Sequence, residues 1–302
     1  MSTKTRVSLL FMTVCFIWGT TWLAMALAVA TIPPIIATGI RFAVAAPLII
    51  LLARVKGVTI WFPRDKGLEF ILISLFYFAI PFTLMIFGEQ YISSGLASII
   101  FANMPVAVLV LSVLLHRQRV AIHQLVGLII ALGSLVTIIG NQMSVSSNGS
   151  LIGVVALVVA VCMHALVYTN VQSRCEGIHV LTYNALPCLM ASVLLIITGY
   201  FMEAPDISNF SALSLSAVIY LGSVAGIGGI MAYFQLNKLA SPFQASICFL
   251  IFPMIALFLD SVYYGRMLSH ESMVLTVFLL LGVLLTKLPE GSFRNIISFK
   301  RS

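Results

Sequence analysis

Two tryptophans one helical turn apart are the first residues in this chain whose types and spacing could form a binding site. In the run Trp18-Gly19-Thr20-Thr21-Trp22, the two indoles share one face of a helix and the threonines add hydroxyl groups. An indole offers a flat apolar surface and one N–H donor, which suits an aromatic or amphipathic ligand. The alternative is packing, in which Gly19 lets a neighbouring helix come close and the indoles fill the space beside it. This window alone favours neither interpretation.

The composition places the chain in a membrane. Hydrophobic residues make up 61% of it and charged residues 8%, which is typical of a polytopic membrane protein rather than a soluble domain. The formal net charge of +7 is not accompanied by a basic stripe, an RNA-binding signature or zinc-finger spacing, so we expect no nucleic-acid partner. The 5 cysteines are scattered, without a CxxC motif or a histidine at ligand spacing. We therefore interpret them as small packing residues and expect no metal site and no cofactor.

Ten apolar runs are long enough to cross a hydrocarbon core of about 30 Å as helices. The first follows Lys4 and Arg6, as in a signal peptide, but it extends to about Ala28 without a small-residue cleavage site, so we expect a retained span. The connections are short and contain no Walker A motif, so we expect no ATP-binding module. The expected spans are 7–28, 34–54, 67–87, 92–115, 120–140, 150–172, 178–201, 211–234, 242–264 and 268–288.

Basic residues indicate how these spans are oriented, because Lys and Arg favour cytoplasmic connections. With the N-terminus inside, Arg266 falls in an outer connection and Arg41 lies within the second span, and the remainder of the 16 Lys and Arg residues are cytoplasmic. We therefore expect a multi-pass inner-membrane protein with both termini in the cytoplasm and the bilayer as its surroundings. The outer segments instead carry the acidic residues Glu89, Glu203, Asp206 and Glu271.

Internal repetition predicts how the spans are arranged. Sliding the chain by 148 positions aligns Ser93–Leu111 with Ser241–Leu259, and eight of these nineteen positions are identical. The fourth and ninth spans are therefore copies, and the chain divides into a first repeat at residues 1–145 and a second at 146–302. Each repeat has five spans, which is an odd number, so the second repeat enters the membrane from the opposite side and is inverted relative to the first. We predict an all-α polytopic membrane protein with ten transmembrane helices in two inverted five-helix repeats, an architecture that many secondary transporters share.

Three short motifs accompany this span count: Trp18-Gly19, Pro33-Pro34 with Arg41-Phe42, and Ser94-Gly95-Leu96-Ala97-Ser98 with Pro105. Together with the two five-span halves, they resemble the EamA-type members of the drug/metabolite transporter superfamily. The resemblance implies a carrier, usually an exporter of amino acids or other small metabolites, with a central cavity lined by spans one, three, four, six, eight and nine. The chain departs from the family after spans four and nine, where a glutamate is common, and this puts a role for those carboxylates in doubt. At these two places the chain has His116-Arg117-Gln118-Arg119 and Gly265-Arg266.

The repeat gives the two tryptophans a counterpart in the sixth span. An offset of 146 aligns Trp18 with His164 and Trp22 with Tyr168, so the spacing of four residues is preserved. We expect the two pairs to face each other at similar depth and to form a substrate-binding site of indoles, a phenol and a titratable imidazole. The alternative for His164 is a histidine held by a neighbouring carbonyl, although an ionisable residue inside a membrane points to function.

Arg41 is the second candidate, about 10 Å below the outer end of the second span. Asp260 lies at comparable depth in the ninth span, and we expect the two to form a gating or structural charge pair, because buried charges need partners. The competing interpretation is that Arg41 binds a substrate carboxylate. Further substrate-binding candidates, each of which also suits packing, are Tyr77, Phe78, Phe82, Asn103 and Tyr233.

These residues favour a secondary transporter that moves a small metabolite, either an amino acid or an aromatic or neutral compound, by alternating access, as a monomer or weak homodimer; the resemblance favours export. A nucleotide-sugar or organophosphate exchanger of the same superfamily is an alternative, but phosphate binding calls for several buried basic residues and only Arg41 is available. A membrane-embedded lipid-modifying enzyme is less favoured, because the 9 acidic residues are dispersed and show no metal-binding spacing. Proton coupling through His164 and transport without coupling both remain open.

Overall fold

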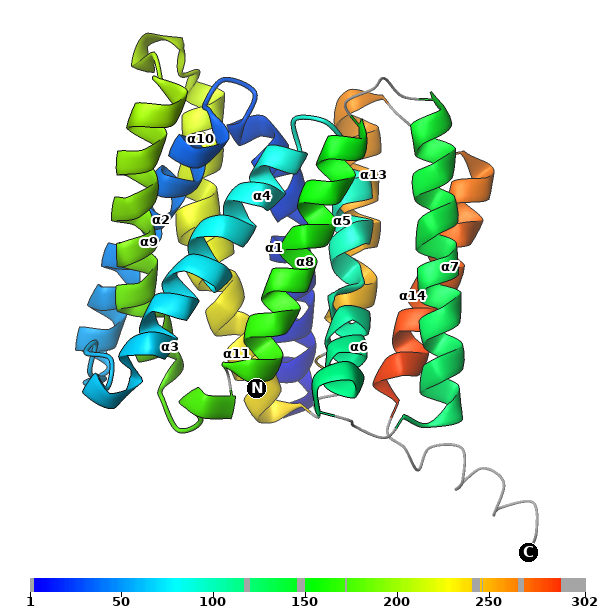
Figure 1. The fold of residues 1–302 in the computed structure, drawn as a ribbon, viewed down its shortest axis with the longest axis horizontal. Coiled ribbons are helices and arrows are strands. Elements are labelled where there is room, and N and C mark those ends of the chain that lie inside the picture. Colours follow the sequence, from blue (N-terminus) through cyan, green and yellow to red (C-terminus); the bar gives the residue numbers. More distant parts are fainter. Residues whose placement is uncertain are drawn as a thin grey trace, which may run out of the picture.

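The computed structural model describes residues 3–116, 120–145, 150–171, 173–240, 245, 247–265 and 269–288. Over these ranges the chain is helical, with short connections and no strand (Figure 1). Within them, 9 helical stretches are long and apolar enough to cross a membrane, and a shorter apolar helix, α13 (Cys248–Tyr264), follows a stretch that is only partly described. The predicted all-α membrane fold is confirmed.

The helices begin and end close to the predicted spans. Several predicted features lie outside the described residues: the connections 117–119 and 146–149, positions 241–244 and 246 of the repeated segment, Arg266, and the segment after Leu288. The long helices outside spans three, four, eight and nine are α1 (Thr3–Ala28), α2 (Pro34–Val55), α7 (Ile122–Val145), α8 (Ser150–Asn170), α9 (Val180–Glu203) and α14 (His270–Lys287).

The third and eighth spans are each interrupted by a π-helical segment. In the third span, Ile73–Ala79 separates α3 (Gly67–Leu72) from α4 (Ile80–Gly88). In the eighth, Leu221–Gly228 separates α10 (Ala212–Tyr220) from α11 (Gly229–Leu239). The two segments start 221 − 73 = 148 residues apart, the same offset that aligns the fourth and ninth spans. Since π-helical turns are uncommon and often found at functional sites, their recurrence at this offset supports both the repeat and a site between these spans.

The packing of the helices follows the same two-fold relation. At one edge of the bundle α2 packs against α9, and at the other edge α7 packs against α14, so that each edge pairs a span of one repeat with its equivalent (Figure 1). In the centre α1 packs against α13 and α11, while its equivalent α8 packs against α5 (Ser94–Ala102), α6 (Met104–His116) and α4. The two inverted repeats therefore interlock through α1 and α8.

The hydrophobic core is continuous at one end of the bundle and divided at the other. We call the end with the N-terminus the basic end, since it carries Arg54, Lys66 and Lys238, and the opposite end the far end, which carries Glu89 and Glu203. One large cluster joins α1, α4, α5, α8 and α13 in the far half. Toward the basic end there are two separate clusters, one around α2 and α9 and the other between α1, α11 and α13. Buried side chains thus form one packed core in the far half and two packed clusters in the basic half.

A carboxylate at the end of α9 caps the start of α2. Glu203 accepts hydrogen bonds from the backbone N–H groups of Ile35 (2.9 Å) and Ile36 (3.0 Å), and the cap residue Pro33 offers no side-chain bond. An anion at this position satisfies two unpaired donors and complements the positive end of the helix dipole.

Glu203→Ala should lower the free energy of unfolding by about 1–2 kcal/mol, as loss of a cap does. Thermal unfolding of the purified protein in detergent measures this, with Glu176→Ala as the control because Glu176 is exposed in a connection. Equal melting temperatures for the two variants would show that the cap contributes nothing.

Candidate binding site

Trp18 lies among aromatic rings of the second repeat. Its ring centroid is 4.8 Å from that of Tyr233 on α11 and 5.5 Å from that of Phe249 on α13, and the side chain is half-buried. Gly229 makes this position possible, since a Cβ atom there would lie 2.9 Å from the indole nitrogen. Two residues that the sequence analysis named as substrate-binding candidates are therefore in direct contact, and their role in binding stays a prediction.

Trp22 is placed differently from Trp18. It is buried, with its ring stacked beside Phe252 at 6.4 Å between centroids and tilted toward Phe101 at 5.4 Å. Both neighbours belong to the continuous core of the far end. In this structure Trp22 therefore packs in the core, as the packing interpretation expects, one helical turn closer to the far end than Trp18.

His164 is buried in an aromatic box on the first-repeat side. Its exposed fraction is 3%, and its ring lies edge-on to Tyr77 (5.1 Å), Phe82 (5.2 Å) and Phe101 (5.8 Å). Nδ1 is 3.0 Å from the backbone carbonyl of Ala160. The histidine thus has the neighbouring carbonyl that the structural interpretation expected, and it also packs against three rings from spans three and four.

Phe101 connects the two sides, because it contacts both Trp22 and His164. Together with Phe252, which also contacts Trp18, it completes a continuous path of rings from the second repeat to the first. We call this set the aromatic network: Tyr233, Phe249, Trp18, Phe252, Trp22, Phe101, His164, Tyr77 and Phe82.

The sequence analysis did not single out Phe101, Phe249 or Phe252. The signal for two of them was present, since Phe101 and Phe249 are an identical pair in the 148-residue alignment.

Tyr168 does not join this network. It is 48% exposed, and no ring of the described residues stacks on it. A ring contact between Tyr168 and the tryptophan pair is therefore not seen, although Tyr168 lies within electrostatic range of Tyr77 and Tyr233. The two helices run in opposite directions, so four residues onward leads toward the far end in α1 but toward the basic end in α8, and Tyr168 is not at the depth of Trp22.

Arg41 and Asp260 do not form the predicted charge pair. The Arg41 guanidinium lies 4.7 Å above the ring of Phe82 and donates from Nη1 to the sulfur of Met25 at 3.7 Å, while Asp260 accepts a 2.7 Å hydrogen bond from Ser94. No carboxylate of the described residues is paired with Arg41, whose exposed fraction is 6%. A cation–π contact takes the place of the expected partner.

Two further candidates occupy helix irregularities. Phe78 belongs to the π-helical segment and packs edge-on against Phe42 at 5.4 Å, beside Phe82. Asn103 lies at the break between α5 and α6, where its Nδ2 donates to the Ile99 carbonyl at 2.9 Å and its Oδ1 is buried without a partner. Phe78 therefore supports the packing around Arg41, whereas Asn103 keeps one free acceptor.

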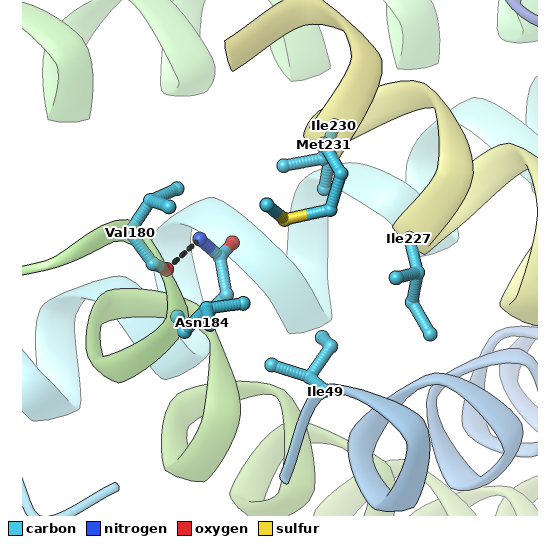
Figure 2. Close-up of a pocket in the computed structure, with 7 residues that line it drawn as sticks. Ile49, Val180, Asn184, Ile227, Ile230 and Met231 are labelled. Carbon is cyan, nitrogen blue, oxygen red and sulfur yellow. Dashed lines mark hydrogen bonds between the residues drawn. The ribbon is translucent and has the colours of Figure 1, made fainter. Parts of the chain in front are cut away.

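A small pocket lies outside this network, between α2, α9 and the eighth span (Figure 2). Its one polar side chain is Asn184, whose Nδ2 donates to the carbonyl of Val180 at 2.6 Å. None of the predicted site residues lines it, and its chemistry is that of helix packing. The lining residues are Ile49, Val180, Leu181, Asn184, Ile227, Ile230 and Met231.

The arrangement defines a class of protein before any comparison is made. Two interlocked inverted repeats, broken spans on both sides of the centre and a divided core at one end are features of secondary transporters. In the described part of the chain, no group of three or more His, Cys, Asp or Glu residues could hold a metal ion.

Comparison with known proteins assigns the family. The chain belongs to the EamA-like transporter family, whose model matches it twice, at residues 5–140 and 151–288. It is 48% identical to the protein PagO of Salmonella typhimurium, over 94% of this chain and 93% of that protein. It is 43% identical to an uncharacterized transporter of Buchnera aphidicola, over 99% of both chains. The membership confirms the resemblance to EamA-type drug/metabolite transporters.

Two more distant similarities add detail. An S-adenosylmethionine/S-adenosylhomocysteine transporter of Chlamydia trachomatis is 25% identical, over 88% of this chain and 84% of that protein. A solved crystal structure, 16% identical, superposes with a TM-score of 0.66 over 93% of this chain and 96% of its own, and shows that the fold is shared.

Proposed function

We propose that this transporter moves a small neutral or zwitterionic metabolite with a flat aromatic or heteroaromatic part by alternating access. The observation that carries the proposal is the aromatic network, which crosses from one repeat to the other at the level where the continuous core divides in two. Half-buried Trp18, Tyr77 and Tyr233 supply ring faces to a ligand, and Trp22 with Phe252 forms the floor. Ring stacking of this kind suits flat solutes.

The direction we propose is export from the cytoplasm. The basic residues at the end of the divided core support a cytoplasmic location for that end and for both termini, in the inner membrane. A carrier whose core is divided at the basic end is then ready to load its substrate from the cytoplasm. Because the two repeats that alternate lie within one chain, we propose that a monomer suffices for transport, with any homodimer weak.

Arg41 adds a preference for a carboxylate. It is the one buried Lys or Arg of the described residues, it lacks an acidic partner, and it lies on Phe82, which in turn contacts His164. A single guanidinium suits one carboxylate better than the several negative charges of a phosphate ester. This favours an amino-acid-like substrate over a nucleotide sugar or organophosphate.

A ligand panel tests the proposal. The purified protein would be screened for thermal stabilisation by aromatic and aliphatic amino acids, their decarboxylated amines, S-adenosylmethionine, nucleosides and phosphate esters, followed by uptake into liposomes. Stabilisation and uptake of flat carboxylate-bearing compounds are expected. A response to phosphate esters alone would overturn the assignment in favour of an organophosphate exchanger.

Gly229→Ala should lower the affinity for such a ligand about tenfold, which is ~1.4 kcal/mol. The added Cβ would meet the Trp18 indole nitrogen at 2.9 Å and displace the ring from its place beside Tyr233. Gly133→Ala is the matched control, since a Cβ there meets nothing within 4 Å. Titration of the ligand by fluorescence or calorimetry gives both affinities, and equal values would mean that the position of the Trp18 ring is unimportant.

A further inference from the structure

Glu89 is a buried carboxyl group that accepts no hydrogen bond from the described residues. It follows the last residue of α4, in the short connection between the third and fourth spans, and its exposed fraction is 7%. Neither of its two carboxylate oxygens has a hydrogen-bond partner in the part of the chain that the structure describes. An ionised carboxylate in such a place carries a large desolvation penalty, whereas the protonated acid carries a much smaller one.

A second buried carboxyl group, Asp260, acts on Glu89 through its charge. Asp260 of α13 belongs to the second repeat and accepts the hydroxyl hydrogen bond of Ser94, which belongs to the first. The backbone is drawn close at this point, because a Cβ at Gly95 would lie 3.5 Å from the other oxygen of Asp260. Burial raises the pKa of Glu89 well above its usual range, and the charge of Asp260 raises it further. Two neighbouring buried carboxyl groups cannot both ionise cheaply.

No basic group of the described residues offsets this pair. The facing elements α4, α5 and the first two turns of α8 carry no titratable side chain at all. Tyr91 in the connection and Tyr263 and Tyr264 at the end of α13 are exposed. Arg41 is engaged with Met25 and Phe82 instead. A proton is the one cation that the geometry accommodates without further ligands.

We propose that Glu89, with Asp260 beside it, is a proton-binding site whose occupancy closes the far end of the transporter. The proposal rests on the alternating-access function proposed above. With the far end closed, Glu89 keeps its proton and Ser94 ties the first repeat to Asp260 of the second. When the repeats part at this end, water reaches Glu89, its O–H bond breaks, and the proton passes to that water. Closure requires the reverse transfer from a hydronium ion to the carboxylate.

The sign of the pH dependence follows from this difference. The closed form binds the proton more tightly than the open, hydrated form. Protonation of Glu89 therefore stabilises the closed form fully when the pH is below the pKa of Glu89 in the open form. This stabilisation is lost as the pH rises through the raised pKa of Glu89 in the closed form. Within this window the ratio of open to closed protein changes by up to about tenfold per pH unit.

Accessibility of the far end to a thiol reagent tests the proposal without any substrate. Ala97→Cys and, separately, Ile92→Cys place a thiol in the buried far-end layer, and a charged, membrane-impermeant maleimide reports its exposure between pH 5 and 9 after subtraction of the parent protein. The rate is first corrected for the thiolate fraction at each pH. Labelling should then rise with pH, by at least about fivefold overall.

Glu89→Gln, which resembles the protonated acid, should hold labelling low and independent of pH. Asp260→Asn should move the midpoint to lower pH, because it removes the neighbouring negative charge, and it keeps the test decisive if Glu89→Gln does not fold. Glu176→Gln, at the basic end, should behave as the wild type. Labelling of the wild type that is constant with pH, or a pH response that survives in Glu89→Gln, would overturn the proposal. The labelling experiment uses no substrate, so its result does not depend on the ligand panel. Each of the two proposals can therefore be contradicted without the other.

Discussion

Trp18→Ala should lower the affinity for the transported metabolite by about 10- to 100-fold, corresponding to ~1.4–2.8 kcal/mol. The indole is half-buried between Tyr233 and Phe249 and faces the level at which the core divides, so its removal deletes the largest flat surface available to a ligand. Equilibrium binding in detergent and initial rates of uptake into liposomes measure the effect, and both should fall together.

Two other tryptophans provide the controls for this prediction. Trp61 is 73% exposed in a connection at the basic end, so Trp61→Ala should leave affinity and melting temperature unchanged. Trp22 is buried between Phe101 and Phe252, so Trp22→Ala should instead lower the melting temperature, as large-to-small core substitutions do. If Trp18→Ala lowered the melting temperature as Trp22→Ala does but bound the ligand with normal affinity, both indoles would serve packing and neither would bind the ligand.

The membrane fold could be predicted from the sequence because its signals are local and repeated. Each span is an apolar run of nearly fixed length, and the copy at Ser93–Leu111 and Ser241–Leu259 reveals the inverted repeat. The contacts in the aromatic network could be predicted less well. Helical spacing shows that Trp18 and Trp22 share a face, but it does not show that Trp22 meets the far-end core while Trp18 meets Tyr233. That outcome depends on the depth and tilt of neighbouring helices.

Charged residues were harder still to place, because a charge has many possible partners. Arg41 and Asp260 were matched by depth, yet the structure gives Arg41 an aromatic face and a sulfur atom, and gives Asp260 a serine hydroxyl. The cap that Glu203 provides for α2 joins residues about 170 positions apart, and no local pattern in the chain marks it. Likewise, Glu89 lies in a short connection in the sequence, and the proposed proton site depends on its burial, which no local pattern predicts.

Arg41 carries the second large prediction, since it is a buried cation with no acidic partner among the described residues, and a substrate carboxylate would supply one. Arg41→Met keeps most of the side-chain volume and removes the charge, so the melting temperature should be unchanged or higher. Affinity for a carboxylate-bearing ligand should fall about 10- to 150-fold, the cost of losing a charge-assisted hydrogen bond worth roughly 1.5–3 kcal/mol. Affinity for the decarboxylated analogue should stay within about twofold, because that ligand never used the guanidinium.

Two further variants separate a binding role for Arg41 from a structural one. Arg41→Lys should retain part of the affinity, because an ammonium attracts a carboxylate but cannot make the paired hydrogen bonds of a guanidinium. Arg54→Met, at an exposed position in the last turn of the same helix, removes an equal charge at the basic end and should change neither affinity. If Arg41→Met weakened both ligands equally, the guanidinium would be acting through Phe82 and His164 to shape the site. The specificity for a carboxylate would then have to come from another donor.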